Sequence, residues 1–313
     1  MRVVVALGGN ALLRRGQKLS VENQRANMST AAKAIVQVIT AGHQVVITHG
    51  NGPQVGLLAL QNEACMTGSR FPLDILDAQS MGMIGYMLEQ EIANLLPKGK
   101  QTATILTQVE VAKDDPAFKH PTKPIGPVYE ELEAKRIAVA NGWTIGRDGN
   151  NYRRLVASPA PERILQIEVI QLLVDNGITL ICAGGGGIPV IAKDDRTHAG
   201  VEAIIDKDRT SALLGNQIKA DALLLLTDVA GVYTDWGKPS QSLIKRLAIK
   251  DIGTEEFPAG SMAPKVESAA AFLKGGGQLA AIGRLEDALA MLQRKAGTQV
   301  FDKCFEIEVS NTR

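Results

Sequence analysis

The sequence is poor in the residues that build several common kinds of binding surface. Phe, Trp and Tyr make up only 4% of its 313 residues, which leaves little for the stacking platforms that bind single-stranded nucleic acid. The formal net charge is +1, so no general attraction to nucleic acid or to an acidic membrane is expected. Neither nucleic acid nor membrane is therefore predicted as a partner.

Cysteine and histidine are also scarce, and their spacing disfavours the usual metal sites. The three cysteines (Cys65, Cys182 and Cys304) lie far apart without a CxxC pair, and the four histidines show neither HxxxH nor HExxH spacing. We expect the cysteines to be reduced and mostly buried, as in a cytoplasmic protein. No metal-ligating residue is predicted.

Long apolar stretches are missing too, since none approaches the ~20 residues that cross a bilayer. Residues 2–12 (RVVVALGGNAL) resemble the hydrophobic part of a signal peptide, but Arg14 and Arg15 follow instead of a cleavage site of small residues. The glycine pair suits a strand that ends in a turn. We expect a cytoplasmic location.

Short apolar segments alternate with longer segments of helical periodicity. Strands are expected at 2–7, 44–48, 101–107, 178–182, 221–226 and 278–282, and helices near 22–41, 53–67, 75–96, 162–176, 208–218 and 265–274. The strands are apolar throughout, as in a parallel sheet that is covered on both faces. This pattern predicts an α/β fold, with an open, doubly wound sheet between two layers of helices.

Residues 113–161 interrupt the alternation with many prolines, glycines and charged residues. A structureless loop of this length is unusual inside a compact domain, so we expect an inserted subdomain. A short helix near 130–140 and a hairpin with hydrophobic positions at Trp143, Ile145, Tyr152 and Leu155 are predicted within it. The insert could act as a lid, or it could be a surface excursion without a role.

Three glycine-rich turns directly follow predicted strands: LGGNA (7–11), HGNGPQ (49–54) and AGGGGIP (183–189). In an open α/β sheet, ligands bind beyond the carboxyl ends of the strands, and glycine lets backbone N–H groups approach an anion. One such turn is ordinary, but three at equivalent strand ends indicate a phosphate-type ligand. Neither GxGxxG nor GxxxxGK[ST] is present at the appropriate place, which disfavours a dinucleotide-binding dehydrogenase and a P-loop enzyme.

The glycine turns contain no cation, so the positive charge that a phosphate requires must come from elsewhere. The candidates are Lys207 in VEAIIDKD, Lys265 in GSMAPKVE and Lys123 in KHPTKPIGP. A solvated surface position is the ordinary interpretation of each lysine alone. Lys207 and Lys265, however, lie at expected helix starts, where the helix dipole disfavours a cation, and this indicates an anion nearby.

The motifs VVALGGNA, HGNGPQVG, PTKPIGP, GGGGIPV, VEAIIDKD, LTDV and GSMAPK occur in this order. From residue 2 to about residue 300, the chain resembles the carbamate kinase branch of the amino acid kinase family. The resemblance implies a three-layer αβα sandwich, whose mainly parallel sheet has about eight strands, and a homodimer. It also implies an N-terminal lobe (1–206, with the lid at about 113–161) that binds carbamate or carbamoyl phosphate, and a C-terminal lobe (207–313) that binds ATP or ADP with Mg²⁺.

Residue roles follow from the same resemblance. Many relatives have a catalytic lysine on the first strand, where this chain has Ala6, and Lys207 takes its place. Lys265 matches a lysine that contacts the transferred phosphoryl group, and Lys123 matches one that reaches the substrate from the lid. Asp208 matches the carboxylate that holds the catalytic lysines in position.

The resemblance also implies which residues line the site. Gly8, Gly9 and Asn10 match a backbone cradle for the phosphoryl group, and Gly50 and Asn51 match its neighbours at the acid substrate. Nucleotide contacts are expected from Thr227, Asp228, Val229, Tyr233 and Met262. Relatives often have an acidic residue where Ala230 stands, so the adenosine contacts stay open. A β-hairpin with a polar turn is an equally good interpretation of 226–239.

The expected mechanism depends on charge and alignment, since a carbamate oxygen is already anionic and needs no general base. Two alternatives stay open. The first is an enzyme of this family with another acceptor, such as acetylglutamate, aspartate or uridylate; PTKPIGP and the Ala6/Lys207 exchange argue against it. The second is a non-catalytic protein that binds carbamoyl phosphate or nucleotide; the presence of Lys207, Lys265 and Asp208 argues against it. The catabolic pathway, of arginine, purines or another nitrogen source, also stays open.

Overall fold

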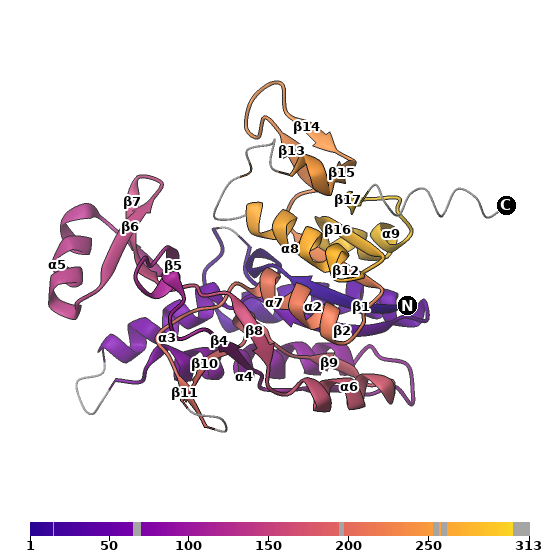
Figure 1. Cartoon of the computed structure of the whole chain (residues 1–313), viewed down its shortest axis with the longest axis horizontal. Helices are drawn as coiled ribbons and strands as arrows, with labels where there is room; N and C mark the ends of the chain where they lie inside the picture. Colours follow the sequence, from indigo (N-terminus) through magenta and orange to yellow (C-terminus); the bar gives the residue numbers. More distant parts are fainter. Residues whose placement is uncertain (15, 65–69, 194–196, 253–256, 258–261, 303–313) are drawn as a thin grey trace.

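A central sheet organises the molecule, seen here in a computed structural model that describes all residues except 15, 65–69, 194–196, 253–256, 258–261 and 303–313 (Figure 1). In this part of the chain the sheet has eight strands in the order β15-β17-β16-β12-β1-β2-β9-β3. All neighbouring pairs among them are parallel except β16 and β17. The strands are β1 (Arg2–Leu7), β2 (Gln44–His49), β3 (Thr102–Thr104), β9 (Thr179–Ile181), β12 (Ala222–Thr227), β15 (Arg246–Ala248), β16 (Leu279–Arg284) and β17 (Thr298–Phe301).

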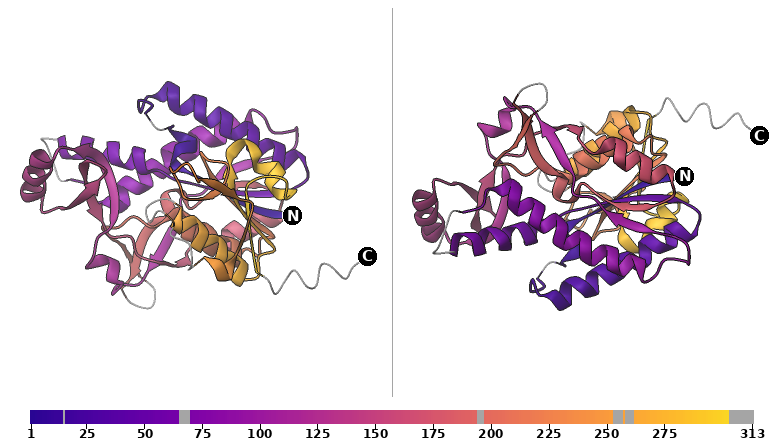
Figure 2. Two further views of the ribbon diagram at one scale, coloured as in Figure 1. Left: turned by 90° about the horizontal axis from the view of Figure 1, so that it is seen from above. Right: turned by 90° about the horizontal axis from the view of Figure 1, so that it is seen from below.

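Both faces of this sheet are buried, which explains why its strands are apolar throughout. Val3, Val5 and Leu7 of β1 belong to one hydrophobic core, and Val4 and Ala6 belong to another, because successive side chains project to opposite faces. The first core includes α2 (Val21–Thr40), α4 (Leu73–Ala93) and α9 (Ala288–Leu292); the second includes α6 (Ile167–Asp175), α7 (Lys207–Gln217) and α8 (Ala263–Lys274). The predicted three-layer sandwich is confirmed (Figure 2).

A second, four-stranded sheet was not predicted. It has the order β11-β10-β4-β8, formed by β4 (Gln108–Val111), β8 (Pro161–Ile164), β10 (Ile188–Ala192) and β11 (His198–Gly200). The prediction of a helix at 162–176 is therefore wrong at its start, because residues up to Ile164 pair with β4 and α6 begins only at Ile167. The expected strand 101–107 is likewise shorter, because it ends at Thr104 before the chain enters this sheet.

The inserted segment is a small unit with its own sheet. After a 3₁₀ turn (Pro116–Phe118) it contains β5 (Lys123–Tyr129), α5 (Glu131–Asn141), β6 (Thr144–Asp148) and β7 (Asn151–Val156), with the strand order β5-β7-β6. The predicted helix and hairpin are both present, and Figure 1 shows them projecting away from the central sheet. Strand β5 packs on α3 (Gly52–Ala64) so closely that a Cβ on Gly56 would lie 2.7 Å from the Cα of Gly126.

The carboxyl ends of β1, β2, β9 and β12 meet at one edge of the sheet, and the glycine-rich turns lie there. The turn after β1 leads into α1 (Gly9–Leu12), and the turn after β9 contains a 3₁₀ segment (Gly184–Gly186). Beyond β12 follow the hairpin of β13 (Val232–Thr234) and β14 (Ser242–Ile244) and two further 3₁₀ turns (Ile249–Asp251 and Leu285–Asp287). Within the described residues, none of the helices has the length and apolar character that a bilayer span requires.

Candidate functional site

A cavity of about 410 Å³ opens at this edge of the sheet. It is lined by the glycine turns, the start of α7, strand β5, the segment after β12 and the start of α8. The predicted site residues that line it are Gly8, Gly9, Gly50, Asn51, Lys123, Lys207, Asp208, Thr227, Asp228, Val229, Tyr233, Met262 and Lys265. Asn10 lies in α1, but its side chain is outside what the structure describes.

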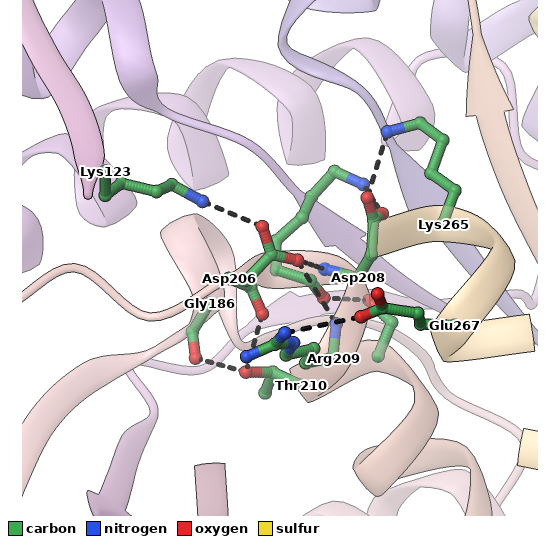
Figure 3. A network of polar contacts seen from close by, with 10 residues as sticks. Lys123, Gly186, Asp206, Asp208, Arg209, Thr210, Lys265 and Glu267 are labelled. Atoms are coloured by element: carbon green, nitrogen blue, oxygen red, sulfur yellow. Dashed lines mark hydrogen bonds and ion pairs between the residues drawn. The ribbon is translucent and has the colours of Figure 1, made fainter. Parts of the chain in front are cut away.

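Lys207 and Lys265 converge on one carboxylate, Asp208; Figure 3 shows Asp208 with Lys265. The Lys207 ammonium binds Asp208 Oδ1, and the Nζ atom of Lys265 donates to Asp208 Oδ2 at 2.9 Å. Lys207 and Asp208 are buried and Lys265 is partly buried, with side-chain exposed fractions of 9%, 5% and 13%. Helices α7 and α8 pack against each other and present the two lysines from their first turns. The two lysines, which are far apart in sequence, therefore lie close together, as predicted.

In this cluster one carboxylate binds two ammonium groups. Burial alone would raise the pKa of Asp208, but the two ammonium groups outweigh it and hold that pKa well below its usual range. Burial lowers the pKa of Lys207, and the nearby Lys265 adds to this effect. For Lys265, burial is opposed by Asp208, and its pKa is raised. Asp206 and Asp228 also act on Lys265 and raise its pKa, so the two ammonium groups are held at the cavity among several carboxylates, where an anionic ligand can interact with both.

Lys123 reaches the same region from β5 of the inserted segment, residues 113–161, for which the name lid is kept as a label. Its Nζ atom donates to Asp206 Oδ2 at 2.8 Å, and Asp206 Oδ1 caps α7 by accepting from the backbone N–H of Asp208 at 2.9 Å. Burial would raise the pKa of Asp206, but Lys123 and the other partners lower it. Asp206 thus connects the lid to the helix that presents Lys207. Sequence reasoning missed this role, although an aspartate immediately before a helical pattern is a signal for an N-cap.

Glycine is required where the turns after β1 and β2 approach their neighbours. The Gly8 N–H donates to the carbonyl of Leu226 at 3.1 Å, and a Cβ on Gly8 would lie 2.8 Å from that oxygen. A Cβ on Gly50 would lie 3.1 Å from the backbone nitrogen of Gly9. The two turns therefore pack backbone to backbone at the cavity, where side chains would block an anion.

Helix α7 is fixed to these turns by buried hydroxyl groups. Thr210 Oγ1 donates to the carbonyl of Gly186 at 2.7 Å (Figure 3), and Ser211 Oγ donates to the carbonyl of Lys207 at 2.6 Å. Ser211 Oγ also lies 2.6 Å from Thr48 Oγ1 of β2. The backbone of Lys207 is thereby held relative to both β2 and the tetraglycine turn, residues Gly184–Gly187.

The other end of the cavity is apolar and aromatic. Tyr233 and Trp236 pack edge to face with ring centroids 5.4 Å apart, and Trp236 is 54% exposed beside Phe257 and Met262. Sequence reasoning missed Trp236 and Phe257, although an aromatic pair near 233–236 is notable in a chain with so few aromatics. A hairpin is present here, but it extends beyond the predicted range 226–239, because β13 pairs with β14 at Ser242–Ile244.

Neither histidine nor cysteine offers obvious chemistry here. His49 is fully buried, and burial lowers its pKa to about 4, so its imidazole is neutral near pH 7. Cys182 is buried and free, as expected, whereas Cys65 and Cys304 lie outside the described residues. Across the described residues, no group of three His, Cys, Asp or Glu side chains is placed to hold a metal ion.

Comparison with known proteins agrees with this geometry. The profile of the Amino acid kinase family matches residues 1–283. A carbamate kinase of Rhizobium meliloti is 53% identical over 300 residues, covering 95% of this chain and 92% of the relative. One of Haemophilus influenzae is 50% identical and covers 97% of both chains.

Solved structures extend the similarity to the fold. The carbamate kinase from Giardia lamblia bound to AMP-PNP has a TM-score of 0.87 and 38% sequence identity, and the match covers 96% of this chain and 98% of that one. Both the sequence and the fold are therefore similar over nearly the full length. The chain belongs to the amino acid kinase family and, within it, to the carbamate kinases.

Proposed function

We propose that the chain transfers a phosphoryl group between carbamoyl phosphate and ADP, forming carbamate and ATP, and that this is the direction in the cell. The observation that carries the proposal is the convergence of Lys207 and Lys265 on Asp208 beside glycine turns. Carbamoyl phosphate is the more reactive phosphoryl donor, so ATP formation is the downhill direction. The relatives named carbamate kinase support the same reaction.

The residues act by positioning and by offsetting charge. Phosphoryl transfer needs alignment and stabilisation of the charge on the equatorial oxygens. A lysine ammonium ~4 Å from such an oxygen interacts by roughly 4 kcal/mol at an effective dielectric constant near 20. Lys207 and Lys265 supply this charge, while Gly8, Gly9 and Gly50 let the phosphoryl group approach the backbone. The attacking or leaving carbamate oxygen is anionic, so no general base is required.

The two ends of the cavity suit two substrates. We assign the nucleotide to the end formed by Thr227, Asp228, Val229, Tyr233 and Met262, and the acid substrate to the end formed by Asn51 and the lid lysine Lys123. This assignment corresponds to a C-terminal nucleotide lobe (207–313) and an N-terminal lobe (1–206). The relative from Giardia lamblia that binds AMP-PNP supports the nucleotide site.

Mg²⁺ fits this site as a companion of the nucleotide. Among the described residues, the carboxylates that line the cavity are Asp206, Asp208 and Asp228; the first two pair with lysines, and Asp228 Oδ1 accepts from Thr227 Oγ1 at 3.1 Å. A hard cation that keeps most of its water and phosphate ligands needs few protein ligands, and of these carboxylates Asp228 is the one that would hold it. Bound there, it would offset part of the negative charge on the nucleotide phosphates.

The proposal includes a homodimer in the cytoplasm. An apolar strip on α4 supports association, because Ile75, Met83 and Tyr86 are 40%, 36% and 57% exposed. Light scattering coupled to size-exclusion chromatography measures the oligomeric state directly, and a monomer at micromolar concentration would contradict this part.

The test of the reaction is ATP formation from ADP and carbamoyl phosphate with Mg²⁺. We expect sustained turnover that carbamate, supplied as ammonium carbamate, inhibits. Acetylglutamate, aspartate and uridylate, each assayed with ATP, should give no comparable ADP release. Tight binding of carbamoyl phosphate without turnover by folded protein would instead support the non-catalytic alternative.

A further inference from the structure

Asn51, at the acid-substrate end of the cavity, is fixed by two side chains of α4. Its Nδ2 group donates to Asp77 Oδ1 and to Ser80 Oγ, the latter at 2.7 Å. All three residues are buried: Asn51 is 3% exposed, Asp77 1% and Ser80 0%. This contact joins the turn after β2 to the helix that covers the sheet edge.

The hydrogen-bond pattern determines which way the carboxamide of Asn51 points. Ser80 Oγ donates its hydrogen to the carbonyl of Asp77 at 2.9 Å, so towards Asn51 it can only accept. Asp77 Oδ1 also accepts, both in the ionised carboxylate and when the proton is on the unpaired Oδ2. Both partners therefore require the NH₂ group of Asn51. If the carboxamide were flipped, its oxygen would face the two acceptors and neither hydrogen bond would form.

The remaining polar atom of the carboxamide is its oxygen. Both Nδ2 hydrogens are used, and Oδ1 makes no hydrogen bond to another described residue although Asn51 lines the cavity. The side chain of Asn51 thus offers the substrate a hydrogen-bond acceptor and no donor. Carbamate and acetate have similar size and charge, but carbamate has an NH₂ group where acetate has a methyl group. An acceptor at this position distinguishes the two.

We propose that Asp77 is a positioning residue for substrate specificity: with Ser80 it turns Asn51 so that Oδ1 accepts a hydrogen bond from the amino group of carbamate or carbamoyl phosphate. The inference rests on the proposed function. It concerns how the site distinguishes its acid substrate from acids of the same shape that lack an N–H group. A site that hydrogen-bonds a substrate group rejects analogues without it, because its own polar group is then left unpaired.

The surroundings of Asp77 point to a role beyond folding. Its Oδ2 atom is buried and has no hydrogen-bond partner in the described part of the chain, and no cation pairs with it there. A buried carboxylate of this kind is destabilising. Burial raises the pKa of Asp77 to about 7, against the lowering effect of Asn51. Its side-chain contact with Asn51 is therefore retained at a cost to stability.

The tetraglycine turn covers this pair and gives the AGGGGIP motif a specific role. Gly185 has a φ of +68°, and a Cβ there would lie 2.4 Å from Asn51 Nδ2 and 2.6 Å from Asp77 Oδ1. Any side chain at this position would displace the pair. The turn is thus shaped around the Asn51–Asp77 contact as well as around the cavity.

The experiment compares two phosphoryl donors, carbamoyl phosphate and acetyl phosphate, in ADP phosphorylation. The full-length wild type is compared with Asp77→Ala, Ser80→Ala and Asp77→Asn. Thr102→Val is the matched control, since it removes a buried hydroxyl on β3 that has no hydrogen-bond partner among the described residues. For each protein, kcat and KM are measured for both donors, with the inhibition constant of acetyl phosphate where it is not turned over.

We expect Asp77→Ala to reduce kcat/KM for carbamoyl phosphate about tenfold or more, mainly through KM. Acetyl phosphate should change by less than about threefold, because it makes no such hydrogen bond. Asp77→Asn should restore most of the preference, since its carbonyl oxygen can still accept from Asn51. Thr102→Val should match the wild type.

The inference would be overturned if Asp77→Ala lowered kcat/KM equally for both phosphoryl donors, or left the preference for carbamoyl phosphate over acetyl phosphate unchanged. Ser80→Ala provides the same comparison if Asp77→Ala does not fold, because it removes the other acceptor with a smaller change. Failure of the proposed function would be recognised separately, because the wild type itself would then not phosphorylate ADP with carbamoyl phosphate. That result would also overturn the inference.

Discussion

At the scale of single residues, the catalytic role of Lys207 and Lys265 can be distinguished by mutation from the structural role of Asp208. Removing one lysine leaves Asp208 paired with the other, so we expect Lys207→Met or Lys265→Met to change the free energy of unfolding little. Each should lower kcat on the order of 10²–10³-fold, as does the loss of one positioned donor in other enzymes. Lys274→Met, on the exposed end of α8, is the matched control and should keep full activity.

The contrasting change is Asp208→Asn. It leaves two buried ammonium groups without their carboxylate, and breaking a buried ion pair in this way costs about 3–5 kcal/mol. Urea unfolding monitored by circular dichroism measures all four variants. Equal destabilisation by the lysine and the aspartate changes would contradict the arrangement in which one carboxylate serves both lysines.

Asp77 makes a prediction about pH and stability. Its pKa is about 7 in the folded protein against an ordinary value of 3.8, so between these values the native state binds more protons than the unfolded chain. Raising the pH through this range therefore lowers the free energy of unfolding. His49 acts in the opposite sense, because burial lowers its pKa from 6.5 to about 4 and stability rises with pH over that range.

The difference between Asp77→Asn and the wild type isolates the contribution of Asp77, since His49 is common to both. From about pH 5 to about pH 7, the variant should gain on the order of 2–3 kcal/mol in free energy of unfolding relative to the wild type. Urea titrations across this range measure the gain. A difference that does not vary with pH would show that Asp77 titrates normally.

At the scale of elements, strand β9 has a glycine with a positive φ beyond each end. Gly177 and Gly185 have φ values of +76° and +68°, so alanine at either position costs about 1 kcal/mol in backbone strain. A Cβ on Gly177 would meet no described atom within 4 Å, whereas one on Gly185 would press on Asn51 and Asp77. Gly177→Ala should keep KM for carbamoyl phosphate, and Gly185→Ala should raise it several-fold and lower the melting temperature further. Similar kinetics in the two variants would contradict the close approach.

The same elements show what the sequence could predict. β1 was predicted at its observed bounds because both faces of the strand are buried, and an apolar run between turns is an unambiguous signal. The strands β4, β8, β10 and β11 were missed because they are short and partly exposed, and their pairing joins segments far apart in the chain. The lid helix and hairpin were predicted from local patterns alone.

The residues of the candidate site also fall into those that the sequence predicted and those that it did not. Motifs and glycines predicted the residues that line the cavity, because they depend on strand ends and helix starts. Asp206 and Asp77 were missed because their roles depend on partners far away in sequence, Lys123 and Asn51, which only folding brings together. Contacts of this kind have no periodicity or spacing that a sequence pattern could reveal.

At the scale of the whole molecule, the cavity joins regions that are separate in sequence, and two tryptophans report on them independently. Trp236 lines the cavity beside Tyr233, and Trp143 lies in the lid beneath the guanidinium of Arg154 at 4.4 Å. These are the two tryptophans of the chain. Trp143→Phe therefore leaves a reporter of the nucleotide end, and Trp236→Phe leaves a reporter of the lid.

Titration of each variant with ADP tests whether the two ends bind separate substrates. ADP alone should change the fluorescence of Trp143→Phe in a saturable way, because an adenine ring near Trp236 excludes water and alters its surroundings. Trp236→Phe should respond little to ADP but should respond to carbamoyl phosphate, whose charge draws Lys123 and its lid strand towards the site. A response to ADP confined to Trp236→Phe would place the nucleotide at the lid and reverse the assignment of the two lobes. Loss of both responses at high salt, with the fold intact, would further show that ionic attraction to the lysines governs binding.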